Sequence, residues 1–196
     1  QTTKKNAVLA APTGIAAVNV GGQTLHSLLG LPTSPYVPDV DAKGEYIPAG
    51  KQNPSLISSW NKNKISLFKK IDLLIIDEIS MVRVDVFNQL DRILKKANNT
   101  NIAFGGKQVI LFGDLFQLPP VAKKEEAEYF TDKYGGIFFF NSPAYKNAKF
   151  EFKELEDVFR QTDKKFINIL NDIRNEEMLC FPQKNASSCA KINWAK

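Results

Sequence analysis

The fold of this chain is decided by one stretch, Leu73-Leu74-Ile75-Ile76-Asp77-Glu78-Ile79-Ser80. An apolar run of this length is typical of a strand buried on both faces, as in a parallel sheet. Asp77 and Glu78 then lie at the carboxyl end of the strand, where open α/β sheets bind ligands. One carboxylate there can hold Mg²⁺ and the next can activate a water, as in a Walker B element. The alternative is that both acids only favour the start of a helix.

Length and composition are those of an ordinary globular chain. The 196 residues, 43% hydrophobic and 24% charged, fit one large domain or one domain with a small insertion. No apolar run approaches the ~20 residues of a membrane span, and the N-terminus has no signal-peptide core. A net charge of +5 permits a polyanionic partner. Cys180 and Cys189 are the only cysteines, which fits a reducing compartment.

A phosphate-binding turn is predicted near the beginning of the chain. Residues Ala7–Ala11 form a short apolar strand, which Pro12 and Gly14 break. Thr13 can cap a helix through Val20, because its hydroxyl can accept a hydrogen bond from an amide of the first turn. A strand, a tight turn and a helix N-terminus favour a phosphate, which can belong to a nucleotide or to a nucleic acid.

A second short helix is expected to begin at Thr24 or Ser27. His26, the only histidine, stands in the same stretch, and from composition alone it is interpreted as a partly buried hydrogen-bonding residue. Residues 32–64 then change character, with five prolines and scattered lysines. This composition predicts an insertion or a loop-rich subdomain.

A helix is predicted over Val84–Ala97, where apolar residues recur at helical spacing, and a second buried strand over Val109–Phe112. Asp114 and Gln117 follow that strand. Beside the strand that ends at Asp77, Gln117 could sense the γ-phosphate of a nucleotide. It could equally be a loop residue that bonds its own backbone, and the two interpretations stay open here.

The last third of the chain predicts further elements of both kinds. The apolar run Gly136–Phe140 predicts a strand, and Ser142 can cap a short helix. The alternation of apolar and polar residues in Phe150–Leu155 predicts an edge strand. Asp163 is expected to open another helix, whereas residues 178–196 carry little pattern.

Strands that alternate with helices predict an α/β domain, with a mainly parallel sheet flanked by helices. Polar residues just past the strand ends are Thr13, Asp77, Glu78, Asp114, Gln117 and Arg160. Acids, a glutamine and an arginine at one sheet edge suit phosphoryl transfer. That reaction needs Mg²⁺, an acid that positions water, and a cation near the developing charge.

Four segments, in order, resemble motifs of the Pif family of DNA helicases, in the RecD-like branch of helicase superfamily one. Motif Ia and its neighbour are resembled by Ala11–Ala17 with Gly21–Ser27, and motif II is resembled by Ile75–Val82. Motif III is resembled by Gly105–Val121, and motif IV with the helix after it is resembled by Glu154–Gln161 with Leu170–Arg174. Each motif alone is weak to moderate, but four in the family's order are highly specific. The resemblance covers roughly residues 7–177 and implies a RecA-like fold of the P-loop NTPase type.

The resemblance implies a role for each polar residue of the predicted edge. Asp77 would bind Mg²⁺, and Glu78 would activate the water that attacks ATP. Gln117 would sense the γ-phosphate and couple it to DNA, and Arg160 would contact the γ-phosphate as an arginine finger. ATP and Mg²⁺ are therefore the expected cofactors.

The resemblance also implies DNA as the partner. Thr13 and His26 would hold the backbone of single-stranded DNA, which overturns the structural interpretation of His26 given above. Residues 32–64 stand where the family carries a small wedge-like subdomain. The expected parent protein is a monomeric 5′→3′ helicase that acts on single strands and DNA forks, with no membrane partner.

Two parts of the family pattern are missing from this sequence. Only six residues precede the Ala7–Ala11 strand, and they contain no glycine, so the phosphate-binding loop ending in Gly-Lys-Ser/Thr is not among them. The second RecA-like domain is missing too. Because the chain also begins with Gln, we expect a piece of a longer protein that is inactive alone. Its expected parts are a core of 1–31 and 65–177, the insertion 32–64 and an irregular tail 178–196.

Two other functions stay open at the level of sequence. One is a nucleic-acid-binding module on a RecA-like scaffold that does not hydrolyse ATP. The other is a P-loop ATPase that acts on a different substrate. For the parent, Glu78, Gln117 and Arg160 argue against the first, and Thr13 with Thr24–Ser27 argues against the second. The expected location is the bacterial cytoplasm, at the nucleoid, with the nucleus or mitochondrion as the alternative.

Overall fold

The computed structural model describes residues 5–31, 62–155, 165 and 167. The chain divides into two units, Gln1–Phe150 and Glu151–Lys196, and the elements below belong to the first. Most of the predicted insertion, the predicted helix from Asp163 apart from residues 165 and 167, and the tail 178–196 lie outside the described residues. The division of the chain into a core, an insertion and a tail stays a prediction.

The centre of the first unit is a four-stranded parallel sheet with the strand order β2-β1-β3-β4. The strands are β1 Ala7–Ala11, β2 Gln23–Thr24, β3 Leu73–Ile76 and β4 Gln108–Leu111. Ala10 is paired with Ile76, and Ile76 with Leu111, so three carboxyl ends coincide. The predicted fold class, a mainly parallel α/β sheet, is confirmed.

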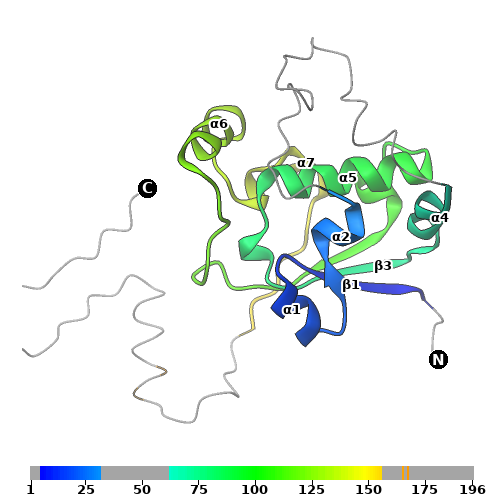
Figure 1. Ribbon diagram of the computed structural model, residues 1–196, viewed down its shortest axis with the longest axis horizontal. Helices are drawn as coiled ribbons and strands as arrows, with labels where there is room; N and C mark the ends of the chain where they lie inside the picture. The colour runs from blue at the N-terminus through cyan, green and yellow to red at the C-terminus, as the bar shows by residue number, and fades with distance from the viewer. Residues whose placement is uncertain (1–4, 32–61, 156–164, 166, 168–196) are drawn as a thin grey trace, which may run out of the picture. The chain divides into compact units, whose positions relative to one another are not determined.

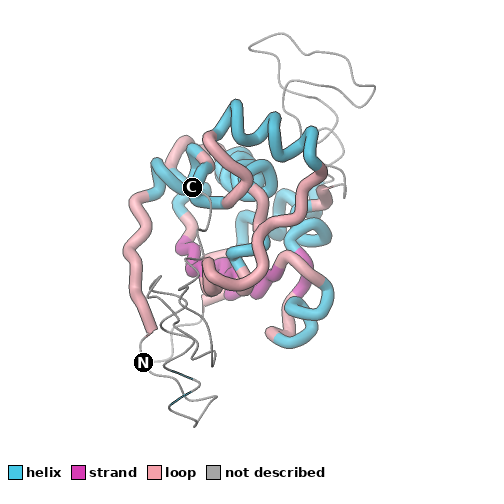
Figure 2. Tube along the Cα trace, turned by 90° about the vertical axis from the view of Figure 1, so that its left-hand side faces the viewer, coloured by secondary structure: helices cyan, strands magenta, loops and turns pink. Residues whose placement is uncertain are grey.

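Six helices accompany the sheet in the described part of the chain (Figure 1). They are α1 Gly14–Asn19, α2 Leu25–Leu29, α4 Lys62–Lys70, α5 Val84–Asn98, α6 Lys124–Tyr134 and α7 Pro143–Ala148. The crossovers β1-α1-β2 and β3-α5-β4 run in opposite directions across the sheet. Right-handed connections therefore place α1 and α5 on opposite faces, and Figure 2 shows the strands below the larger helices.

Helix α5 supplies more of the buried apolar core than any other described element, and its apolar face is the one that its sequence period predicted. Its Phe87, Leu90, Leu94 and Ala97 are all buried. Phe87 contacts the rings of Phe104 and Phe139, at centroid distances of 5.5 and 5.6 Å. Full burial of a side chain of this size stabilises a fold by about 1.5–3 kcal/mol.

Strand β3 is not buried equally on both faces, contrary to the prediction. Leu74 and Ile76 are fully buried, whereas Leu73 and Ile75 are only half buried. The reason is that α5 covers one face of the sheet with α2 and α4 beside it, whereas on the other face the described residues provide only the six-residue α1. The apolar run predicted the strand correctly, but not how the second face is covered.

The two strands predicted in the last third of the chain are wrong. Within Gly136–Phe140, Phe138 makes an isolated antiparallel bridge to Arg83, and a short 3₁₀ helix, Phe139–Asn141, follows. Residues 151–155 form no strand. In both segments the aromatic rings pack in a cluster around Tyr145. The centre of the Tyr145 ring lies 5.3 Å from the ring centre of Phe139 and 5.1 Å from that of Phe150.

Candidate functional site

The carboxyl edge of the sheet brings three loops together through backbone hydrogen bonds. The amide of Asp77 donates to the carbonyl of Ala10 (2.9 Å), and the amide of Ile79 donates to the carbonyl of Phe112 (2.9 Å). The turn that carries Asp77 and Glu78 is thus held between the end of β1 and the end of β4. Thr13 lies three residues after Ala10, and Asp114 lies two residues after Phe112, so both follow strands that end at the edge carrying Asp77 and Glu78.

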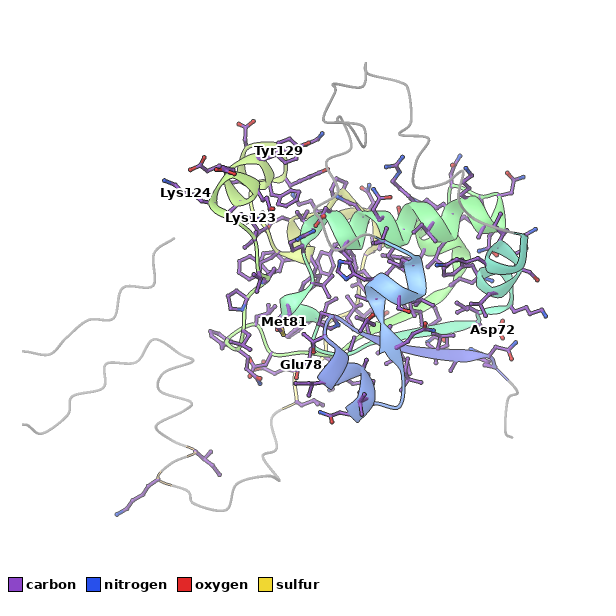
Figure 3. All side chains as sticks on the ribbon, in the orientation of Figure 1. Asp72, Glu78, Met81, Lys123, Lys124 and Tyr129 are labelled. Carbon is purple, nitrogen blue, oxygen red and sulfur yellow. The ribbon has the colours of Figure 1, made fainter. Side chains whose placement is uncertain are left out.

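Glu78 has a backbone conformation that is uncommon for its residue type. Its φ of 51° and ψ of 45° lie in the left-handed region, which non-glycine residues seldom occupy. Such strain concentrates at functional sites. Glu78 precedes the 3₁₀ helix Ile79–Met81, but its carboxylate makes no capping hydrogen bond to that helix. Capping therefore does not explain this acid, which is half buried at the end of β3 opposite to Asp72 (Figure 3).

Asp114 organises the loop after β4. Its carboxylate accepts a hydrogen bond from the amide of Phe116 (3.0 Å) and from the side-chain amide of Gln117 (3.2 Å). The backbone amide of Gln117 also donates to the carbonyl of Asp114 (3.1 Å). Gln117 is exposed, and its side-chain amide is held by the carboxylate of Asp114 within the same loop, so its proposed role toward a nucleotide stays a prediction.

Thr13 and His26 line one shallow pocket of about 170 Å³. The hydroxyl of Thr13 accepts a hydrogen bond from the amide of Ala16 (3.2 Å), so Thr13 caps α1 as predicted. The hydroxyl of Thr24 caps α2 through the amide of Ser27 (3.2 Å), which decides between the two candidate caps. The pocket is lined by Pro12, Thr13, Leu25, His26, Met81, Val82, Arg83, Val86 and Val121.

An ion pair in the wall of this pocket was not predicted from the sequence. Arg83 donates through Nε and Nη2 to the two carboxylate oxygens of Asp85, at 2.9 and 2.8 Å. The side chains are 12% and 1% exposed, so the pair is largely withdrawn from water. The guanidinium also lies 5.9 Å from the ring centre of Phe130 in α6. In the sequence, only the spacing of Arg83 two residues before Asp85, at the beginning of a predicted helix, could have indicated this ion pair.

The electrostatics of the pocket follow from this pair. Burial lowers the pKa of Arg83, but the hydrogen bonds that Arg83 donates to Asp85 and the charges of Asp85 and Glu126 outweigh it and raise that pKa overall. The pKa of His26 is lowered from 6.5, mainly by burial and then by the charge of Arg83, while Asp85 partly opposes the shift. His26 is therefore neutral at pH 7.

Asp77 is the candidate ligand for Mg²⁺. Among the described residues no group of three histidines, cysteines or acids could enclose a metal. Mg²⁺ keeps several waters and often uses one or two carboxylates, so the half-buried Asp77 fits it. The hydroxyl of Ser80, three residues on, is buried and has no hydrogen-bond partner in the described structure. Arg160 lies outside the described residues.

The part of the chain that the structure describes contains no helix long and apolar enough to cross a membrane.

Comparison with known proteins identifies the relatives of this chain. The ATP-dependent DNA helicase RRM3 of Saccharomyces cerevisiae is 36% identical over 175 residues, covering 89% of this chain and 22% of the relative. The human ATP-dependent DNA helicase PIF1 is 34% identical over 167 residues, covering 85% of this chain and 23% of the relative. The chain thus spans about a fifth of the length of these curated relatives.

Solved structures agree. A Bacteroides Pif1 helicase in complex with ADP-AlF3 and single-stranded DNA matches with a TM-score of 0.75 and 47% identity, over 90% of this chain and 38% of that chain. A structure of two coordinating Pif1 helicases at forked double-stranded DNA matches with a TM-score of 0.76 and 46% identity, over 90% and 39%. The profile of the family described as "PIF1-like helicase" matches residues 1–180. The predicted resemblance is confirmed, and the chain belongs to the PIF1-like helicase family.

Proposed function

We propose that this chain is part of the first RecA-like domain of an ATP-dependent 5′→3′ DNA helicase that works in replication, recombination, repair, or telomere and genome maintenance. One observation carries the proposal: the turn of Asp77 and Glu78 is bonded on one side to Ala10 and on the other to Phe112. These bonds support the proposal that the residues assigned to nucleotide chemistry and those assigned to DNA act at one edge of the sheet. Relatives described as ATP-dependent DNA helicases support it.

In this proposal Asp77 holds Mg²⁺, which supplies charge neutralisation to the phosphates when it is bound. Glu78 orients and deprotonates the attacking water, and its strained backbone fixes the direction of the carboxylate. When ATP is bound, the side-chain amide of Gln117 exchanges its hydrogen bond with the carboxylate of Asp114 for a hydrogen bond to the γ-phosphate. Arg160 supplies a cation to the same phosphate.

On the DNA side, Thr13 and His26 face a single strand. Binding of DNA that is independent of sequence depends on contacts to phosphates and on base stacking. The neutral imidazole of His26 can stack on a base or donate one hydrogen bond. We propose a monomeric parent that engages single strands and forks. The proposed location is the bacterial cytoplasm, with the nucleus or mitochondrion as the alternative.

The alternative is a nucleic-acid-binding module that does not hydrolyse ATP. One observation favours it for this chain alone: Gln117 and Asp114 satisfy each other within their own loop. No Gly-Lys-Ser or Gly-Lys-Thr occurs in the sequence to cradle a β-phosphate. We expect the 196-residue chain to show no ATP hydrolysis. Isothermal calorimetry with ATP and Mg²⁺ should give no micromolar binding, and a micromolar affinity would refute this expectation.

The test of DNA binding is fluorescence anisotropy of a labelled single-stranded oligonucleotide, read at several salt concentrations with the 196-residue chain. We expect weak, sequence-tolerant binding with a shallow dependence on salt. Two or three neutralised phosphates give a slope of roughly −1.4 to −2.1 in log K against log salt. Lack of binding to any single strand at low salt would overturn the proposed function.

A further inference from the structure

The pocket beside Thr13 and His26 does not have the charge of a phosphate site. Its one cation among the described lining residues is Arg83, and both oxygens of Asp85 already neutralise that guanidinium. Glu126 adds a further negative charge that acts on Arg83. A phosphate placed in the pocket would face a balanced ion pair and an additional acid, which gives little net attraction.

The floor of the pocket is apolar. Leu25, Val82 and Val86 line it, and they are 1%, 2% and 5% exposed. Removing a neutral, flat group from water against these side chains is favourable, whereas burying an anion there is costly. The shape and chemistry of such a site, apolar with a few polar groups at the rim, are those of a site for a small organic group.

Polar groups stand around this floor. The imidazole of His26 is half buried and neutral at pH 7, so it can stack on a π-face without repelling a neighbouring cation. Arg83 is held in one orientation by Asp85 and by the ring of Phe130. Its Nη1 donates no hydrogen bond to any residue that the structure describes, so this donor remains for the edge of a ligand.

We infer that this pocket receives one unstacked base of the single strand, while the phosphates of the same strand stay outside it. Among the lining residues Thr13 and His26 are half buried and Val86 is buried, and in this inference Arg83 donates a hydrogen bond to the edge of the base. The inference rests on the proposed function, which brings single-stranded DNA to this edge of the sheet. It adds a base-binding residue, Arg83, that the family resemblance did not assign.

The test separates bases from phosphates. The 196-residue chain is titrated into labelled oligothymidine and into a strand of the same length made of abasic residues, which keeps every phosphate. We expect the abasic strand to bind roughly 5- to 100-fold more weakly, the range for one stacked base, with an unchanged salt slope. Equal affinities for the two strands would overturn the inference and leave the proposed function standing. Lack of binding to both strands would overturn both.

A variant then locates the base. Val86→Phe fills the floor of the pocket, and we expect it to bind oligothymidine as weakly as the abasic strand, again with the same salt slope. Ile102→Phe is the matched control, because Ile102 is 65% exposed and does not line the pocket. If Val86→Phe keeps full discrimination between the two strands, the base binds elsewhere and the inference is wrong. If circular dichroism shows that Val86→Phe is unfolded, the double variant Arg83→Met with Asp85→Leu replaces it, because it leaves no buried charge uncompensated, and the same loss of discrimination is expected.

Discussion

Gly113 lies so close to Ile79 that a β-carbon on Gly113 would stand 2.9 Å from the backbone nitrogen of Ile79 and 2.9 Å from its Cγ2. The same nitrogen donates a hydrogen bond to the carbonyl of Phe112 (2.9 Å). The loop of Asp114 is therefore packed backbone to backbone against the turn of Glu78. A side chain at position 113 must move one loop relative to the other.

We expect Gly113→Ala to lower the free energy of unfolding by about 1–3 kcal/mol, the usual cost of an added group in a packed site. Urea unfolding of the 196-residue chain measures it. The matched control is Gly14→Ala, since a β-carbon at Gly14 meets nothing within 4 Å. Equal unfolding midpoints for the two variants would show that the contact between the loops is not tight.

Glu78→Gln tests the proposed base in a longer protein that carries the phosphate-binding loop. The amide keeps the shape of the side chain but cannot accept a proton, so ATP turnover should fall by roughly 100-fold or more while nucleotide binding is retained. Steady-state ATPase rates and calorimetry give the two quantities. Glu125→Gln, on the exposed side of α6, is the control and should turn over normally. Full turnover in Glu78→Gln would remove the assigned role.

The lowered pKa of His26 predicts a dependence of stability on pH. The unfolded chain takes up a proton on this imidazole near pH 6.5, whereas the folded chain resists it because of burial and the charge of Arg83, with Asp85 opposing. The unfolded state therefore binds more protons below pH 6.5, and the stability of the chain falls as the pH decreases.

The reference for this effect is His26→Gln, which carries no titrating imidazole. The unfolding free energy of the wild type minus that of this variant should decrease as the pH falls from 7.5 towards the lowered pKa of His26 in the folded state. Urea unfolding at several pH values measures it. A difference that stays constant or grows with falling pH would contradict the burial of the imidazole.

The ion pair of Arg83 and Asp85 predicts non-additive mutational effects. Asp85→Ala leaves a largely buried guanidinium without its bidentate partner, and we expect a loss of about 3–5 kcal/mol. The double replacement Arg83→Met with Asp85→Leu should cost less than that, because no charge is left uncompensated. A double-mutant cycle made of Arg83→Met, Asp85→Leu and their combination, measured by urea unfolding, gives the coupling energy. Additive single effects would show that the pair is not electrostatically isolated from water.

Features set by neighbouring residues could be predicted from the sequence alone. Thr13, Thr24 and Ser142 cap their helices through amides only three residues away, so local spacing was sufficient. The period of Val84–Ala97 predicted α5 to within one residue, because its apolar stripe meets the core. Asp77 and Glu78 were placed correctly at a strand end, although their roles stay predictions.

Features that depend on contacts between distant segments could not be predicted in this way. The alternation in Phe150–Leu155 is that of a strand, yet Phe150 packs against Tyr145 and residues 151–155 form no strand. Half of β3 is less buried than its apolar sequence suggested. The meeting of His26 with Arg83 has the same origin. Burial and charge pairing depend on which surfaces the fold brings together, whereas caps and helical periods depend on residues one turn away.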